Sequence, residues 1–389
     1  MGLFETNVQM IGNRTMMRTE SAYEYYARSE RPSIASIRRV LGEWYEDLPE
    51  ESKLDVQKRF RSPVPGQHEG AFFEIYLHRL FTRMGFELQA HPDVEEKDTH
   101  PDYLVKKQGR PCFYLEATIT RDSSDDVAER QRADQVFETL EKLVSPDFYI
   151  SIRVQGAPQT PPPGAKLRKK IESWLQSLNY ENVRSTFDSG DLEAMPSLLW
   201  KHDDWRLTIE PIPKSPERRG STDVRAIGMT LPPVRQLSLH DDVKKAVEVK
   251  NKYGDLGLPF IVAINVTDEF RVTKNDVMNA LFGEETILFD GKRALPGPRR
   301  PNGAWYSGRG ASNTKISAVM VYPNVTPWNL QDREPWIVLN PWAKYPLNAE
   351  AIRLSKFVPN HSDNALLEVK GMSCNRFLQL SEDWPGPDD

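Results

Sequence analysis

Asp102 and Glu116 are the two residues whose types and spacing most clearly indicate chemistry. Asp102 immediately precedes a short run, 103–107, and Glu116 lies inside a second one, 112–118; both runs are typical of strands. If Gly109 is the centre of a three-residue hairpin loop between them, the register places Asp102 opposite Glu116 on one face of the sheet. Their Cβ atoms would then be roughly 4.5–5.5 Å apart, whereas a slip of one residue would separate the acids onto opposite faces.

Two carboxylates that face each other at this distance repel, unless a cation lies between them or both face water. Oxygen ligands suit Mg²⁺ and Mn²⁺, which bind one or two protein carboxylates and complete their shell with water and phosphate oxygens. Glu116 lies within an apolar run, where an unpaired carboxylate is costly, so the alternative is a salt bridge to a neighbouring Lys or Arg. The pair therefore predicts either a site for Mg²⁺ or Mn²⁺ or a buried ion pair.

Glu74 is a third acid that the expected elements could bring to the same place. It lies in a segment, 68–84, whose apolar residues recur at helical spacing and which Gly85 closes as a C-cap. On a helical wheel, Glu74 lies at the border of an apolar arc formed by Phe73, Tyr76, Leu77, Leu80, Phe81 and Met84. A helix packed on a sheet would present an acid at that position to the edge of the sheet.

This order of elements resembles that of the PD-(D/E)XK, or restriction-endonuclease-like, nucleases: a helix with a glutamate, a strand, a Pro-Asp pair, and a hairpin leading to (D/E)-x-K. The resemblance is carried by Glu74, by His-Pro-Asp at 100–102 and by Leu-Glu-Ala-Thr at 115–118. The wider arrangement is similar to that of uncharacterised bacterial proteins with this nuclease-like core, through the segments AFFEIYLHRLFTRMGFE, FYLEAT, IPK, KYGDLGLPFIVAIN, ALFG and NPWA. This family implies a fold more than a function.

The resemblance implies a metal-dependent endonuclease that hydrolyses phosphodiester bonds of DNA, in bacterial defence, such as antiviral defence, or in repair. Asp102 and Glu116 would hold Mg²⁺ or Mn²⁺, and Glu74 would be a further ligand, direct or through water. The metal would lower the pKa of a bound water and neutralise charge on the scissile phosphate. The oligomeric state stays open: nucleases that cut both strands often pair two sites, so a homodimer or a partner protein is one alternative.

Thr118 is the departure from the family's pattern, because it stands where the family has a lysine that positions the attacking water and stabilises charge on the phosphate. A threonine hydroxyl cannot supply a positive charge. In relatives of this fold, catalytic residues have migrated to a neighbouring helix. Lys106, which shares a strand face with Asp102, is one candidate replacement, and Lys245 and Lys252 on a helix expected at 241–253 are others.

Without such a replacement, metal binding could persist while cleavage is weak or absent. The alternative function is therefore a nuclease-like module that binds nucleic acid or a partner protein without cutting it. The two facing acids favour the nuclease, since a scaffold has no physical need for them, and Thr118 favours the binding module.

The alternation of helices and strands predicts the α/β class, here a mixed α+β arrangement in which a restriction-endonuclease-like core has a mixed sheet flanked by helices. Three regions are expected: an N-terminal helical segment 1–66, the nuclease-like core 67–158, and a C-terminal α/β region 159–389 that could complete the core sheet. A proline-rich spacer beginning at Gln159 marks the second boundary. Whether a helix expected at 125–144 or the one at 241–253 completes the core sheet stays open, and the answer decides which lysine can reach the acids.

A basic loop at 291–311 holds five basic residues and no acidic one, with two adjacent aromatic residues among glycines and prolines. Basic side chains can track phosphates and aromatic rings can stack on bases, so this loop is the candidate nucleic-acid contact. The alternative is a solvated loop. The candidate residues are Lys292, Arg293, Arg299, Arg300, Trp305 and Arg309.

The composition narrows the class of protein. Of the 389 residues, 39% are hydrophobic and nine are Trp, which excludes global disorder. The net charge of −5 gives the chain no overall positive charge for binding nucleic acid, so any such contact must be local. No apolar stretch is long enough for a membrane helix, and the N-terminus lacks a signal-peptide profile. The only cysteines, Cys112 and Cys374, exclude a disulfide framework, and the histidines at 78, 91 and 100 match no zinc spacing. The expected location is the cytoplasm.

Overall fold

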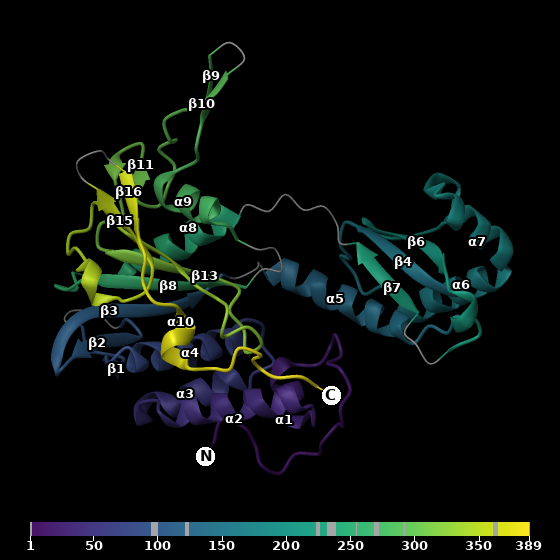
Figure 1. Ribbon diagram of the computed structural model, residues 1–389, viewed down its shortest axis with the longest axis horizontal. Coiled ribbons are helices and arrows are strands. Elements are labelled where there is room, and N and C mark those ends of the chain that lie inside the picture. The colour runs from purple at the N-terminus through teal and green to yellow at the C-terminus, as the bar shows by residue number, and fades with distance from the viewer. Residues whose placement is uncertain are drawn as a thin grey trace. The chain divides into compact units, whose positions relative to one another are not determined.

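The computed structural model describes residues 2–94, 100–120, 124–222, 226–231, 239–253, 255–267, 272–290, 293–360 and 365–388 (Figure 1). The chain forms two compact units, each with its own sheet and hydrophobic core. Unit 1 comprises Met1–Arg14, Ser21–Arg121 and Ser238–Asp389, and unit 2 comprises Thr15–Glu20 and Asp122–Leu237.

This division differs from the expected boundary between residues 158 and 159. The proline-rich spacer lies inside unit 2, where it joins strand β4 (Phe148–Gln155) to helix α6 (Gly164–Ser177). Side chains of both elements share the core of that unit, for example Ile152 and Ile171. The spacer is therefore a connection within one unit. In the sequence, the main part of unit 2, Asp122–Leu237, is an insertion between two strands of the unit 1 sheet, one ending at Ile119 and the next starting at Phe260.

Unit 1 is built on an eight-stranded mixed sheet with the order β1-β2-β3-β8-β13-β14-β15-β16. Its pairs are parallel at β3·β8, β8·β13 and β14·β15 and antiparallel elsewhere. Strand β8, which is apolar except for Asn265, is buried at every residue, as a parallel strand covered on both faces must be. The strands are β1 (Glu87–Ala90), β2 (Tyr103–Lys107), β3 (Arg110–Ile119), β8 (Phe260–Val266), β13 (Ala318–Pro323), β14 (Trp336–Leu339), β15 (Lys356–Asn360) and β16 (Ala365–Val369).

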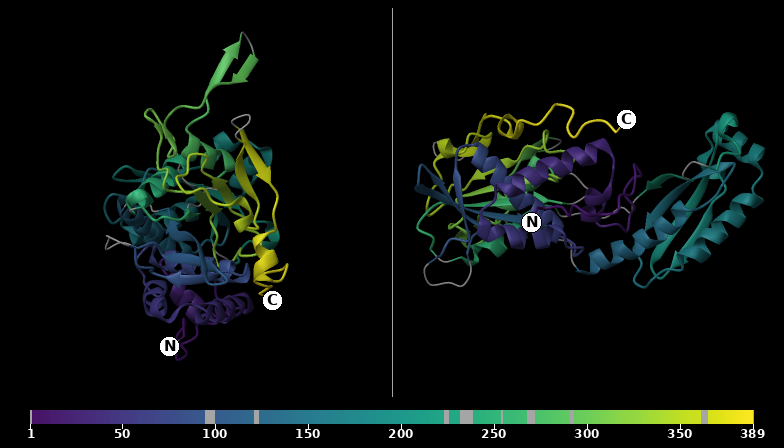
Figure 2. Two further views of the ribbon diagram at one scale, coloured as in Figure 1. Left: turned by 90° about the vertical axis from the view of Figure 1, so that its left-hand side faces the viewer. Right: turned by 90° about the horizontal axis from the view of Figure 1, so that it is seen from below.

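Helices flank this sheet on both sides, which confirms the predicted mixed α/β class (Figures 1 and 2). One side carries α1 (Ala22–Arg28), α2 (Pro32–Glu46), α3 (Glu50–Phe60) and α4 (Gln67–Arg83), and the other carries α8 (Leu239–Val249) and α9 (Lys274–Phe282). The short helix α10 (Cys374–Leu378) follows the last strand. The helix that completes the core sheet is thus α8, because α5 (Ser124–Glu141) belongs to unit 2.

The β2–β3 hairpin has the predicted register at the end that matters for the acids. Tyr103 pairs with Leu115. The same register, extended by one residue, places Asp102 opposite Glu116. The turn, however, has two residues, Gln108 and Gly109, both with positive φ, as in the tight turns that match strand twist. A bulge between residues 105 and 106 absorbs the difference from the expected three-residue loop.

Unit 2 is a four-stranded sheet with the order β5-β6-β4-β7, covered by helices. Its core includes Phe137 from α5 and Trp205, whose rings meet edge to face at 6.1 Å. The remaining elements of this unit are α7 (Tyr180–Ser189), β5 (Leu198–His202), β6 (Trp205–Pro213) and β7 (Ile227–Leu231), while unit 1 adds the short hairpins β9 (Ile287–Asp290)–β10 (Arg293–Pro296) and β11 (Tyr306–Ser307)–β12 (Gly310–Ala311). Among the described helices, none is long and apolar enough to cross a membrane.

His78 makes the stability of unit 1 depend on pH. Its side chain on α4 is 5% exposed, and burial lowers its pKa from 6.5 to about 4. Because the folded pKa is the lower one, the unfolded chain takes up the proton first, and stability is lost as pH falls from about 6.5 towards 4. Between pH 7 and pH 5, we expect the free energy of unfolding to fall by about 2 kcal/mol because His78 is protonated in the unfolded chain and not in the folded one. Urea unfolding of His78→Leu should show a smaller loss over this range by that amount, and an unchanged loss would contradict the assignment.

Candidate functional site

Glu116 lies in the middle of β3, between β2 and β8, and is 3% exposed. Its Oε1 accepts a hydrogen bond at 2.5 Å from the Nζ of Lys250, which follows α8. Its Oε2 accepts a hydrogen bond at 3.2 Å from the backbone N–H of Asp102. A buried carboxylate must be paired, and both oxygens of Glu116 have a donor. The salt bridge that the sequence left as the alternative reading of Glu116 is therefore present, with Lys250 as the partner.

Asp102 lies beside Glu116, at the start of β2. Its Oδ2 accepts a hydrogen bond at 2.7 Å from the backbone N–H of Ala117, which fixes the carboxyl against the neighbouring strand. Burial, followed by the charges of Glu116 and Glu74, raises the pKa of Asp102 well above its usual range, while the Ala117 hydrogen bond and Lys250 oppose this. The structure thus brings the three predicted acids and one lysine into one electrostatic cluster.

Glu74 reaches this cluster from α4, but its carboxylate is already bound. The guanidinium of Arg59 on α3 donates to both oxygens, at 2.8 Å and 2.7 Å. Such a bidentate pair fixes the orientation of the carboxylate as well as its charge. Burial raises the pKa of Glu74, and Arg59 opposes the rise. Arg59 was not predicted from the sequence, because nothing in its local pattern marks which acid a distant arginine will meet.

Lys250 was also missed, and here the sequence held a usable signal. Val243 and Val247 are buried on the inner face of α8, and a residue seven positions after Val243 lies on the same face. That residue is Lys250, whose side chain is 17% exposed. A lysine at an inward position of an amphipathic helix must find an acid, and Glu116 is that acid.

The lysine that pairs with Glu116 is Lys250, whereas the sequence suggested Lys106, Lys245 or Lys252. Lys245 is exposed on α8, and Lys252 lies over the Tyr253 ring at 5.3 Å. The expected helix at 241–253 ends at Val249 and continues as a 3₁₀ turn, which rotates the later residues out of phase. Lys106 is four residues along β2 from Asp102, about 13 Å at strand spacing.

Thr118 and Tyr253 complete the surroundings of Glu116. Thr118 is partly buried on the Glu116 side of β3 and pairs with Ile264 of β8. The Tyr253 ring packs edge to face on Phe260 at 5.6 Å. Burial, and then the charge of Glu116 and a hydrogen bond to it, raise the pKa of Tyr253 far above its usual range. Tyr253 is a second neighbour of Glu116 that the sequence did not predict.

The donor set fits a divalent cation in its chemistry. Asp102 and Glu116 offer hard oxygen atoms, and burial, followed by the charges of Glu116 and Glu74, raises the pKa of Asp102, while Lys250 opposes the rise. Within the described ranges, no group of three His, Cys, Asp or Glu side chains is arranged to hold a metal. Glu74 stays with Arg59, which leaves Asp102 and Glu116 as the pair of adjacent acids at this site.

One prediction for the basic loop is wrong, that Trp305 stacks on a base. Trp305 is 0% exposed and packs edge to face on Phe282 of α9 at 5.4 Å, so its ring cannot stack on a base. Arg299 donates to Asn279 and to the Gly283 carbonyl, at 3.0 Å and 2.7 Å, and also pairs with Glu285. These interactions make part of the loop a packed segment of unit 1.

Other residues of the loop stay accessible. Arg300 is exposed although it pairs with Glu284 at 3.0 Å, and Arg293 and Arg309 are exposed. Lys292 lies outside the described residues. Tyr306 and Trp342, 40% and 38% exposed, stack with ring centroids 5.6 Å apart and give this region an open aromatic surface.

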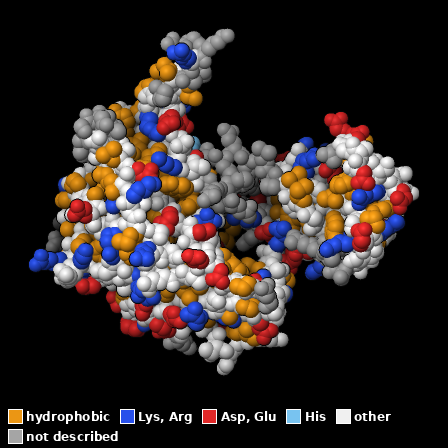
Figure 3. Space-filling view, in the orientation of Figure 1, with side chains coloured by type: hydrophobic (Ala, Val, Ile, Leu, Met, Phe, Trp, Pro, Cys, Tyr) orange, Lys and Arg blue, Asp and Glu red, His pale blue; other side chains and the backbone are white. Residues whose placement is uncertain are grey.

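Over the visible face of unit 1, Lys and Arg side chains are interspersed with Asp and Glu (Figure 3). Comparisons of the chain with models of protein families, with curated proteins and with solved structures give no match.

Proposed function

We propose that this chain is a metal-dependent nuclease with a restriction-endonuclease-like core in unit 1. The observation that carries the proposal is the Lys250–Glu116 contact of 2.5 Å. The resemblance to the PD-(D/E)XK nucleases requires a lysine beside the second acid, and Thr118 cannot supply one. Lys250 supplies the positive charge from the turn after α8, and the two acids retain the expected register.

Each residue then has a defined role. Asp102 and Glu116 would hold Mg²⁺ or Mn²⁺, which when bound lowers the pKa of a water and offsets charge on the scissile phosphate. Lys250 holds a fixed positive charge beside Glu116, where it can orient the attacking water and stabilise charge developing on the phosphate. The backbone N–H of Ala117 orients Asp102, and Arg59 holds Glu74 in place behind the pair.

DNA is the proposed substrate, and bacterial defence or repair the proposed context, both by analogy with the resemblance. The accessible residues of the basic loop support contact with nucleic acid, since Arg293 and Arg309 are exposed and the ring of Tyr306 is accessible. Trp342, from outside the loop, stacks on Tyr306 and adds ring surface. This surface replaces Trp305 as the candidate for base stacking.

The proposal is tested by cleavage of supercoiled plasmid and labelled single strands with Mg²⁺, Mn²⁺ or EDTA. We expect metal-dependent cleavage that Asp102→Ala and Glu116→Ala each reduce about 1000-fold, since each removes a metal ligand. Glu368→Ala, which removes an exposed acid from the edge strand β16, should cleave like the wild type. Circular dichroism confirms that each variant is folded.

Two results together would overturn the proposal: no cleavage with any metal, and no Mn²⁺ binding by calorimetry on the same samples. The buried acids would then be a structural ion-pair cluster. The alternative function, a nuclease-like module that binds nucleic acid or a partner protein without cutting, would take its place.

A further inference from the structure

In the described part of unit 2, helices cover one face of the four-stranded sheet and leave the other face open. The core takes alternate residues of β4 and β6, and side chains of α5, α6 and α7 pack on that side. The residues between them form the open face, where Leu199, Met229 and Leu231 are 51%, 47% and 37% exposed. Large apolar side chains gathered on an uncovered face indicate an interaction surface.

Three basic side chains lie together at one end of the open face. The register of β5 and β6 places Lys201 directly opposite Arg206, and both are exposed. On β4, Arg153 pairs with Thr208, which is two residues from Arg206 and on the same face of β6. Direct neighbours on one face have Cβ atoms about 4.5–5.5 Å apart, and diagonal neighbours lie about 7–8 Å apart. Lys201, Arg206 and Arg153 therefore form a basic band across three adjacent strands.

The positive charge of this band is not compensated within the sheet. Like charges that face each other across two strands repel, unless an anion lies between them. Among the described residues, neither Lys201 nor Arg206 has an acidic partner. Arg153 has a contact of 3.4 Å with Glu210, and its side chain is still 51% exposed. Three cations against one carboxylate make the band a site for an anionic ligand.

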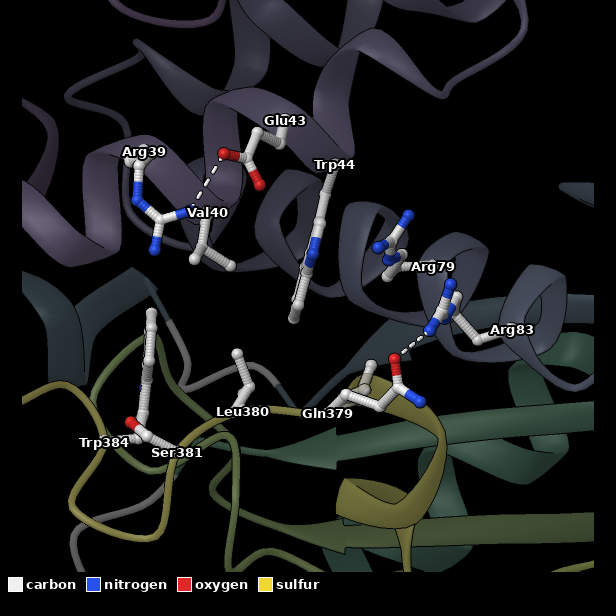
Figure 4. A pocket seen from close by; sticks show the side chains of 11 residues that line it. Arg39, Val40, Glu43, Trp44, Arg79, Arg83, Gln379, Leu380, Ser381 and Trp384 are labelled. Carbon is white, nitrogen blue, oxygen red and sulfur yellow. Dashed lines mark hydrogen bonds and ion pairs between the residues drawn. The ribbon is translucent and has the colours of Figure 1, made fainter.

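Arginines in a pocket of unit 1 show the opposite situation (Figure 4). The pocket lies between α2, α4 and the chain that follows α10. Arg39 pairs with Glu43 at 2.9 Å, and Arg79 pairs with Asp47 at 2.6 Å. Because acids of the chain already neutralise these two groups, the pocket gives no comparable indication of an anion. The unpaired cations of unit 2 are therefore the stronger evidence.

Apolar side chains adjoin the band on the same face. Leu199 is two residues from Lys201 on β5, and Leu231 of β7 pairs with Arg153. A ligand that lies on the band therefore also contacts apolar surface. A nucleic-acid duplex presents its phosphates on the outside and keeps its bases stacked inside, whereas a single strand offers phosphates and the flat faces of its bases together. The combination of charges and apolar groups fits the single strand.

We propose that the open face of unit 2 binds single-stranded nucleic acid. The phosphates would lie along the basic band, where they neutralise the facing pair Lys201 and Arg206. The bases would lie against Leu199 and Leu231. An acidic protein segment would match the same charges, so the choice of nucleic acid rests on the proposed nuclease function.

Fluorescence anisotropy of the full chain with a labelled oligo(dT) of about 12 nucleotides tests the proposal. EDTA is present throughout, so that binding is measured without metal-dependent cleavage. Lys201→Gln and Arg206→Gln should each weaken binding about 3- to 10-fold, as expected for the loss of a phosphate contact. The double variant should also reduce the slope of log K against log salt by about 1.4, since each phosphate contact of a single strand contributes about 0.7.

Further variants separate binding from folding and from the acids of unit 1. Lys169→Gln is the matched control: it makes the same charge change at an exposed position of α6, on the helix side of the sheet, and should bind like the wild type. Because Lys201→Gln relieves a repulsion, it should not lower the unfolding temperature while it weakens binding. Leu199→Ser should weaken binding of oligo(dT) about 3-fold through the bases. Asp102→Ala should bind like the wild type.

The proposal is overturned if oligo(dT) does not bind at low salt, or if Lys201→Gln and Arg206→Gln leave the affinity and the salt slope unchanged. It is also overturned if a duplex of the same length binds as tightly as the single strand. Competition by polyglutamate as strong as that by unlabelled oligo(dT) would assign the open face to an acidic protein partner instead. Plasmid cleavage reports on the acids of unit 1 and not on this binding, so failure of the nuclease function and failure of this proposal are seen separately.

Discussion

Lys250→Met is expected to reduce the rate of metal-dependent DNA cleavage by about 100- to 1000-fold, the usual cost of removing one group that stabilises transition-state charge. Lys250 makes the 2.5 Å contact with Glu116 but is not itself a metal ligand. Binding of Mn²⁺, measured by calorimetry, should therefore survive the substitution. A loss confined to the rate constant would separate the role of Lys250 from that of Asp102 and Glu116.

The other lysines of this segment provide the controls. Lys245→Met and Lys252→Met change the same charge at exposed positions and should cleave at close to the wild-type rate. If either of them, and not Lys250→Met, abolished cleavage, the assignment of Lys250 would be wrong. Because Lys250→Met leaves a buried carboxylate without its cation, thermal unfolding must show that the assay temperature is below the transition.

A second substitution tests whether Lys250 acts through its positive charge. Thr118 lies on the Glu116 side of β3, at the position where the PD-(D/E)XK pattern has its lysine. Adding Thr118→Lys to Lys250→Met would restore a positive charge beside Glu116 from the strand itself. We expect part of the lost rate to return, whereas a purely structural role for Lys250 would give no recovery of cleavage.

The local part of the site could be predicted because it depends on short-range patterns. The strand 103–107 is bounded in the structure as in the prediction, since the turn residues that follow it define its end. The facing register of Asp102 and Glu116 follows from the hairpin even though the turn is shorter and a bulge corrects it. A two-residue turn with a bulge near it leaves the same register at the other end of the hairpin as a three-residue loop would.

The missing parts of the site come from the packing of one element on another, which is not read from the pattern of a single segment. Arg59 meets Glu74 through the packing of α3 on α4, which no periodicity encodes. Lys250 was predictable from the inward face of α8, seven residues after the buried Val243, whereas Lys245 and Lys252 lie on the opposite face. The division into units failed for a related reason: a proline-rich segment marks a rigid connection but does not say whether the elements it joins share a core.

Trp305→Ala should destabilise unit 1 by about 3–5 kcal/mol, the usual cost of truncating a large buried aromatic side chain. Trp305 is 0% exposed, and its ring contacts Phe282 of α9. Its backbone is fixed as well, by hydrogen bonds of 2.9 Å to the Leu281 carbonyl and 2.8 Å from the N–H of Ser312. Denaturant unfolding measures the change in free energy directly.

Trp342→Ala is the matched control, since Trp342 is 38% exposed and stacks on Tyr306 at the surface. We expect the free energy of unfolding of this variant to fall by about 1 kcal/mol or less. Its affinity for single-stranded DNA should also fall if the exposed rings of Tyr306 and Trp342 stack on bases. Trp305 is thus a core residue, and Trp342 is an exposed tryptophan of this region. An unchanged stability for Trp305→Ala, together with weaker DNA binding, would return the loop to the recognition role predicted from its sequence.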